Sequence, residues 1–229
     1  MLEVCYTYTM GKMRRPSRLV ISQTWTPELA YAIGLIATDG CLSYPWYLVD
    51  LTSKDREQLE NLNRCLGTSI TIGSKSNGKG KWCLRIQFKN KTFYEFLVSL
   101  GLTPKKSKTL GVLKIPPNLF WDFLRGSYDG DGCSYAYWDK RWRSSFMFYT
   151  CFVSASKIHL DWLRSEIFKR IKVLGHITHA EGYSIYQLKY AKSDSLKLLR
   201  KMYYSKRVVC LSRKRLKLDK ILGTVGEKL

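Results

Sequence analysis

The sequence predicts an α/β fold of the mixed α+β kind, built as a pseudo-two-fold pair of repeats that each run αββαββα. Three observations predict it. Two helical segments, 26–41 and 118–133, have equal lengths and both end on Asp-Gly-Cys. After each segment, alternating apolar residues and turn residues follow in the same order, which is typical of an internal repeat. The 229 residues, of which 45% are hydrophobic, suffice for two small packed units.

The first repeat covers 26–104 and opens with a helix. Thr26 is a good N-cap, Pro27 suits the first helical position, and Gly40 allows the chain to leave the helix after Asp39. The later elements should be strands at 41–43 and 47–52, a helix at 55–66, strands at about 69–74 and 82–88, and a helix at about 92–100.

The second repeat covers 118–229 and shows the same order. Its first helix ends at Asp131-Gly132. The later elements should be strands at 133–138 and 144–153, a helix at 156–173, strands at 176–181 and 184–190, a helix at 193–202 and a basic helix at 211–222. An extension, 1–25, precedes the repeats, and a linker, 105–117, joins them.

The charge of the chain points to a polyanionic partner. The 39 Lys and Arg against 18 Asp and Glu give a net charge of +21, for which nucleic acid is the commonest partner. The alternative is a basic protein without a site. No apolar run reaches 18 residues, so we expect no membrane partner. The seven cysteines are odd in number and form no C-x-x-C pair, which indicates reduced thiols and an intracellular protein of unassigned compartment.

Helices over one face of each antiparallel sheet would leave the other face open. In the strand 82–89, apolar residues alternate with Arg85, Gln87 and Lys89, whose donors suit base edges and phosphates. The alternative is an ordinary solvated face. Because the charge is high and both repeats share the pattern, we predict that DNA is contacted by Lys75, Lys79, Lys81, Arg85, Gln87, Lys89, Lys140, Arg141, Arg143, Gln187 and Lys189.

Small residues in the two repeated helices favour a close pairing. Gly34 and Gly126 lie inside helices, where glycine costs about 0.5–1 kcal/mol relative to alanine, and a close helix–helix approach would explain why this cost is tolerated. Such a pairing would bring Asp39 and Asp131 together, and a divalent cation between them would serve phosphodiester hydrolysis. The alternative is that each Asp-Gly merely ends a helix. Asp129 should project to a different side.

The segments Ala32–Gly40 and Leu124–Gly132 both resemble the nine-residue LAGLIDADG motif, and the repeats that carry them cover about 27–222. The chain is therefore similar to single-chain, two-motif LAGLIDADG homing endonucleases. The resemblance implies a monomer whose two sheets form a saddle on double-stranded DNA. It also implies a Mg²⁺-dependent double-strand break in a long asymmetric target.

In that family the eighth motif residue binds the metal, which assigns Asp39 and Asp131 as catalytic metal ligands. The seventh residues, Thr38 and Gly130, are assigned to the same metal site. Ala37 departs from the motif at the sixth position without touching the ligand.

The resemblance also implies basic groups near the metals. Lys54, at the end of the second strand, is the catalytic candidate in the first repeat, whereas 153–156 offers no lysine in the second. We therefore expect two unequal sites. Four further residues are weaker catalytic candidates, equally well interpreted as phosphate-anchoring surface charges: Lys106, Lys108, Arg213 and Lys214.

The sequence also bears on a zinc site and on two other functions. His176 and His179 are the only histidine pair at short spacing, but they lack Cys or carboxylate partners, which indicates a surface or DNA-contacting role and no zinc site. An intron RNA maturase would share the basic surface, although sheet-based groove reading suits B-form DNA better. A catalytically inactive DNA-binding regulator would share the fold, but both acidic positions are present.

Overall fold

The computed structural model describes residues 19–229 except 77, 79, 81, 143, 144, 180, 181 and 183. The first repeat consists of α1 (Pro27–Asp39), β1 (Gly40–Ser43), β2 (Leu48–Ser53), α2 (Arg56–Leu66), β3 (Gly73–Ser76), β4 (Trp82–Lys89) and α3 (Lys91–Ser99). The second consists of α4 (Phe120–Asp131), β5 (Cys133–Trp138), β6 (Phe146–Ser154), α5 (Lys157–Ile171), β7 (His176–His179), β8 (Tyr186–Ala191) and α6 (Lys192–Met202). Two short 3-10 helices, η1 (Lys106–Lys108) and η2 (Pro117–Leu119), lie between α3 and α4. Helix α7 (Ser212–Gly223) comes after α6 and is the last helix of the described chain.

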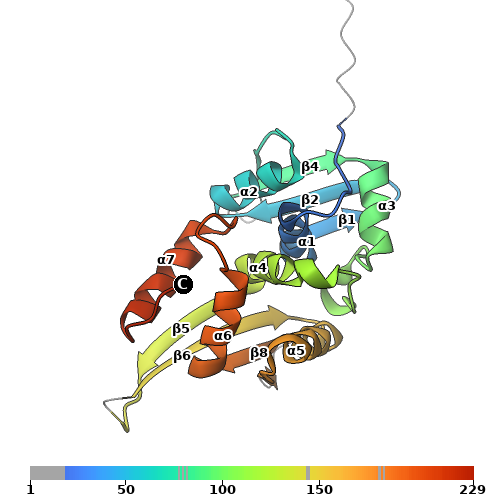
Figure 1. The fold of residues 1–229 in the computed structure, drawn as a ribbon. Helices are drawn as coiled ribbons and strands as arrows, with labels where there is room; N and C mark the ends of the chain where they lie inside the picture. The colour runs from blue at the N-terminus through green and yellow to red at the C-terminus, as the bar shows by residue number, and fades with distance from the viewer. Residues whose placement is uncertain are drawn as a thin grey trace, which may run out of the picture.

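The predicted fold class is confirmed. Each repeat forms an antiparallel four-stranded sheet, in the order β1-β2-β4-β3 in the first and β5-β6-β8-β7 in the second. Helices α2 and α3 pack on the first sheet and α5 and α6 on the second, while α1 and α4 lie side by side between the sheets (Figure 1). None of the described helices combines the length and the apolar character that a membrane span requires.

Strand β3 is shorter than its sequence suggests because a side chain holds the residues before it. Asn63 on α2 donates from Nδ2 to the carbonyl of Ile70 at 2.8 Å and accepts from the Ile70 N–H at 3.0 Å. The backbone at Ile70 is therefore bonded to a helix side chain, and strand pairing starts only at Gly73, opposite Arg85.

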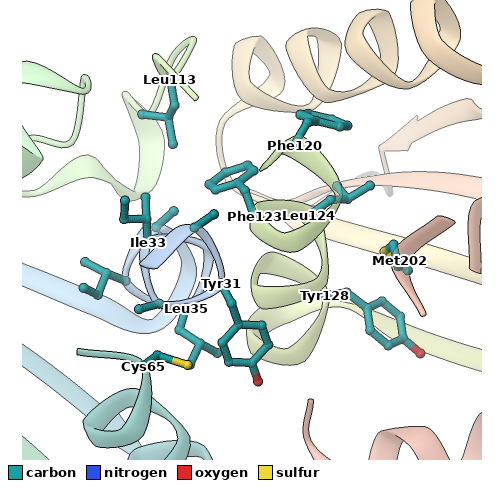
Figure 2. Close-up of a cluster of buried hydrophobic side chains, with 14 of the residues drawn as sticks. Tyr31, Ile33, Leu35, Cys65, Leu113, Phe120, Phe123, Leu124, Tyr128 and Met202 are labelled. Carbon is teal, nitrogen blue, oxygen red and sulfur yellow. The ribbon is translucent and has the colours of Figure 1, made fainter. Parts of the chain in front are cut away.

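The pairing of α1 with α4 depends on two glycines. A Cβ on Gly34 would lie 2.2 Å from the Phe123 carbonyl oxygen, and one on Gly126 would lie 2.1 Å from the Tyr31 carbonyl oxygen. No larger residue fits at either position without moving a backbone. Figure 2 shows the apolar side chains that surround this contact, and the buried residues of both repeats belong to one continuous core.

Buried polar contacts fix the segment that leads into α7. Arg125, only 1% exposed, donates to Asp122 and to the carbonyls of Met202 and Val209, each at 2.7 Å. Asp129 accepts the Leu211 N–H at 2.7 Å. These bonds dock α7 against the ends of the central helices, which places its lysines beside them.

Candidate functional site

Asp39 and Asp131 are the last residues of α1 and α4. Gly40 and Gly132 follow them with extended backbone, so in each repeat the backbone passes directly from helix to strand. Glycine is required here for space and not for a left-handed turn. A Cβ on Gly40 would lie 2.5 Å from the Ile36 carbonyl oxygen, and one on Gly132 would lie 2.6 Å from that of Tyr128.

The ends of the two helices meet. A Cβ on Gly130 would lie 1.9 Å from Thr38 Oγ1 and 3.1 Å from Asp39 Oδ2, so the two motif ends are in contact. The pKa of Asp39 is raised, first by partial removal from water and then by the charge of Asp131. The pKa of Asp131 is also raised, because surrounding protein atoms displace part of its water. Two carboxylates held this way favour a cation between them.

Two buried lysines flank the carboxylates. Lys106 is 5% exposed and donates to the Gly40 carbonyl. Lys214 donates to the carbonyls of Tyr128, Gly130 and Gly132 at 2.6, 2.9 and 2.6 Å. Burial lowers the pKa of Lys106, and it lowers that of Lys214 to about 8. The charges of both lysines lower the pKa of each carboxyl, so the four groups form one electrostatic cluster.

Gln58 is a site residue that the sequence analysis missed. It is 3% exposed, and its Nε2 donates to Asp39 Oδ2 at 2.6 Å. Its amide oxygen accepts the Ser53 hydroxyl, also at 2.6 Å. A glutamine on an amphipathic helix carries no sequence signal for this role, because its partner belongs to another element.

The second repeat has a different residue at the matching position. In each repeat a serine hydroxyl at the end of the second strand accepts the N–H of the next helix's N-cap: Ser53 from Asp55 at 3.0 Å, and Ser154 from Ser156 at 3.1 Å. Three residues after these caps stand Gln58 and His159. The two repeats are therefore unequal at this place.

His159 is buried and turned toward the linker. Its Nδ1 is 2.9 Å from the Gly111 carbonyl oxygen, and burial lowers its pKa to about 4. The neutral ring therefore donates from Nδ1. A small cavity of about 20 Å³ beside Asp131 is lined by His159, Thr38 and Ser127, among others. The Ser127 hydroxyl in it has no hydrogen-bond partner among the described residues.

Of the residues predicted to bind the metal or to take part in catalysis, some lie together at the ends of α1 and α4 and others do not. Asp39, Asp131, Thr38 and Gly130 meet at the helix ends. The Thr38 hydroxyl lies within hydrogen-bonding distance of the carbonyls of Gly34 and Leu35, and the Gly130 carbonyl accepts from Lys214. Lys54 is exposed and is not among the charged groups that act on Asp39.

Two of the four weaker catalytic candidates lie in the site and two do not. Lys106 and Lys214 lie in the site, whereas Lys108 is exposed and Arg213 pairs with Asp55 at 2.6 Å. Asp129 accepts the Tyr31 hydroxyl at 2.7 Å and the Leu211 N–H, and its charge acts on Lys214. Burial raises its pKa to about 6.

The predicted DNA-contacting residues that the structure describes lie on the open sheet faces or the connections beside them. On the first sheet, Lys75 and Arg85 approach Asp50 at 3.6 and 3.8 Å, and Gln87 donates to it at 3.4 Å. Lys89 is exposed at the end of β4.

On the second sheet, Gln187 and Lys189 lie on β8 in half-buried positions. Lys140 and Arg141 are exposed between β5 and β6, where Arg141 pairs with Asp139 at 3.1 Å. Lys79, Lys81 and Arg143 lie outside the described residues.

The histidine pair forms no metal site in the described part of the chain. His176 is exposed on β7, and the ring of His179 packs against Tyr186 with 4.5 Å between centroids. Among the described residues no group of three or more His, Cys, Asp or Glu side chains could hold a metal ion.

Comparison with solved structures identifies the architecture. The homing endonuclease I-WcaI bound to its DNA recognition sequence matches with a TM-score of 0.55, at 16% identity over 86% of this chain and 89% of that one. The chain has the LAGLIDADG fold. I-DmoI in complex with DNA and Mn matches with a TM-score of 0.52, at 16% identity over 78% of this chain and 97% of that one.

A solved structure that is not named as an endonuclease has a similar fold. Full-length DUF199/WhiA from Thermatoga maritima matches with a TM-score of 0.56, at 14% identity over 89% of this chain. The match spans 62% of the length of that protein. Neither a protein-family model nor a curated protein matches the sequence.

Proposed function

We propose that this protein is a site-specific DNA endonuclease that makes a double-strand break by metal-dependent phosphodiester hydrolysis. One observation carries the proposal. The two aspartates that end the paired helices meet at the helix ends, and a buried lysine flanks each of them. A protein that only binds DNA has no need of two carboxylates there, because they repel each other and the phosphates.

The donor set fits a hard divalent cation such as Mg²⁺. This ion is usually held by one or two carboxylates, with waters and substrate phosphates filling the other positions. Gln58 engages only Oδ2 of Asp39, and no described residue donates a hydrogen bond to Asp131. Carboxylate oxygens of both residues therefore remain available. When bound, the metal supplies activation of water and stabilisation of the leaving oxygen.

The residues of the chain have separate roles in the proposed reaction. Asp39 and Asp131 hold the metal, and Gln58 fixes the rotamer of the Asp39 carboxylate. Lys106 and Lys214 place positive charge beside the scissile phosphates while their bonds to backbone carbonyls brace the helix–strand turns. Each aspartate would serve one DNA strand, so the chain would act as a monomer.

Double-stranded DNA is the proposed substrate because of the open sheet faces. The major groove is about 12 Å wide and accepts elements that carry side-chain donors to base edges. The first sheet offers Lys75, Arg85 and Gln87 there, and the chain carries a net charge of +21. The related folds of I-WcaI and I-DmoI are solved with DNA.

The test is incubation of the full chain with a random duplex library and Mg²⁺, followed by sequencing of the new ends. A unique pair of cuts is expected. Asp39→Asn and Asp131→Asn should each abolish cleavage of the strand that the changed residue serves, and both should retain binding in Ca²⁺. Asp161→Asn, at an exposed side chain of α5, makes the same charge change and should cut normally.

Two outcomes would overturn the proposal. Wild-type protein that binds one duplex tightly in Mg²⁺ without cutting it would indicate a DNA-binding regulator on this fold. Full double-strand cleavage by Asp39→Asn would refute the metal assignment.

A further inference from the structure

The open faces of the two sheets differ in chemistry. The first carries the charged group of Lys75, Arg85 and Asp50. On the second, the open face of β5 and β6 carries Tyr135, Tyr137, Met147 and Tyr149, which we call the aromatic face. Tyr135 lies opposite Tyr149 and Tyr137 lies opposite Met147, so the four side chains share one side of the sheet.

The three tyrosine rings of the aromatic face form one ordered layer. Tyr149 stacks on Tyr135 with 5.2 Å between centroids and on Tyr137 with 6.3 Å, at interplanar angles of 22° and 15°. Tyr135 is 36% exposed and Tyr137 is 47% exposed. Rings that support each other lose little freedom when a partner covers them, which is a feature of good binding surfaces.

The aromatic face belongs to the second repeat alone. Tyr135 is the fourth residue after Asp131, and the fourth residue after Asp39 is Ser43. In the first repeat, Asp50 lies opposite Cys41 on the neighbouring strand. In the second repeat, the equivalent residue opposite Cys133 is Cys151. The second repeat thus replaces a hydroxyl and a carboxylate by a ring and a thiol at equivalent positions.

We propose that the aromatic face reads a thymine-rich stretch of the half-site that the second repeat binds, through the 5-methyl groups of thymine. The inference rests on the proposed function only in taking duplex DNA as the substrate. In the major groove, thymine presents a methyl group and one acceptor, whereas guanine presents two acceptors and cytosine an amino donor. The rings and Met147 cover a methyl group well, and each ring carries only one hydroxyl, which leaves the polar edge of a G·C pair partly unsatisfied.

Strand β5 also fixes where the thymines should lie. It begins beside Asp131, and Tyr135 and Tyr137 stand two and four residues beyond Cys133. These steps correspond to about 7 and 13 Å along a strand. One base pair spans about 3.4 Å along the duplex. The thymines should therefore lie roughly two to four base pairs farther from the cleavage site than the base pair beside Cys133. Lys189 lies opposite Cys151 on the neighbouring strand. Its positive charge is therefore beside the Cys133 end of the aromatic face.

The first experiment selects bound duplexes in Ca²⁺ with the full chain, so that the readout does not require cleavage. Thymine should be enriched at these positions in one half-site only. Each selected thymine is then replaced by deoxyuridine, which removes only the methyl group. We expect affinity to fall about fourfold per methyl in that half, the factor for one lost methyl-sized contact. The same replacement in the other half should change affinity by less than about twofold.

The second experiment changes the protein. Tyr135→Ser, which installs the residue type of the first repeat, should abolish the difference between thymine and deoxyuridine at the base pair beside Tyr135, about two base pairs out. Phe168→Ser removes an exposed aromatic ring from α5, away from the open face, and should keep the difference. Matching thermal unfolding curves would show that both variants fold.

The outcomes separate this inference from the proposed nuclease activity. Binding with a thymine-methyl effect but without cleavage supports the aromatic face and refutes the nuclease. Cleavage with no effect of deoxyuridine, or with G·C pairs selected at these positions, overturns the aromatic face alone. Stacking on unpaired bases would appear as tighter binding to single strands, and it would also overturn the inference.

Discussion

Gln58 donates from Nε2 to Oδ2 of Asp39 at 2.6 Å, a contact with no counterpart at Asp131 among the described residues. The bond orients one carboxylate of the proposed metal site and leaves the other to be oriented by its metal and substrate. The sequence predicts unequal sites in the two repeats because only the first offers Lys54. Lys54 is exposed, however, and the residues that differ beside the two aspartates are the buried Gln58 and His159.

Replacing Gln58 with alanine should therefore slow one strand cut more than the other. Loss of a partner that orients a metal ligand typically costs 10–100-fold in activity or metal affinity. We expect Gln58→Ala to slow cleavage of the strand served by Asp39 by about that factor and to accumulate nicked plasmid. Strand-specific end labels measure the two rates. Glu60→Ala, on the exposed side of the same helix, is the control. Equal slowing of both strands would contradict the positioning role.

His159 should make the stability of the protein sensitive to acid. Its pKa is lowered from 6.5 to about 4 by burial, so the folded state resists a proton that the unfolded state accepts. The contribution of the neutral ring is complete above pH 6.5 and is lost as the pH falls toward 4. The loss amounts to about 3 kcal/mol at most.

Urea unfolding at pH 7, 5 and 4 measures this loss. His159→Gln, which installs the residue type of the first repeat, cannot titrate in this range. The wild-type protein should therefore lose up to about 3 kcal/mol more unfolding free energy than the variant between pH 7 and 4. Parallel pH profiles for the two proteins would refute the assignment of a buried neutral histidine.

The sequence predicts the parts of this site that are repeated and local. Asp39 and Asp131 could be located because each stands before a glycine at the end of the same helix in both repeats. Lys214 could be named only as one of several candidates, because its bond to the Gly130 carbonyl joins residues 84 positions apart. Gln58 could not be found at all, since its role depends on where α2 lies. The start of β3 could not be predicted for a similar reason, because the Asn63 side chain on α2 bonds the backbone of Ile70 and delays strand pairing until Gly73.

The two interface glycines should be intolerant of alanine. Alanine inside a helix normally stabilises a protein by about 0.5–1 kcal/mol relative to glycine. At Gly126 the added Cβ would meet the Tyr31 carbonyl oxygen at 2.1 Å, so the helices must separate. We expect Gly126→Ala to lower the unfolding free energy by about 3 kcal/mol. Gly223→Ala, where the Cβ meets nothing within 4 Å, should be neutral or stabilising. Equal effects in thermal unfolding would contradict the close packing.

Asp50 should control how selectively the first sheet reads DNA. It is 9% exposed and lies within 3.8 Å of the charged groups of Lys75 and Arg85, which it holds in place on the open face. Asp50→Asn removes that charge, so the two cations become free to follow phosphates. Non-specific binding should then tighten and depend more steeply on salt, by up to about 0.9 in the logarithmic slope per added phosphate contact.

The ratio of specific to non-specific affinity, measured by competition at several salt concentrations, tests the role of Asp50. We expect Asp50→Asn to lower the ratio by about tenfold, because a side chain that is no longer held rigidly discriminates bases less well; one good bidentate contact is worth about 1–3 kcal/mol. Asp161→Asn adds the same net charge on α5, away from the open face, and should leave the ratio unchanged. A fall of the same size in both variants would mean that net charge alone, and not the orientation of Arg85, sets selectivity.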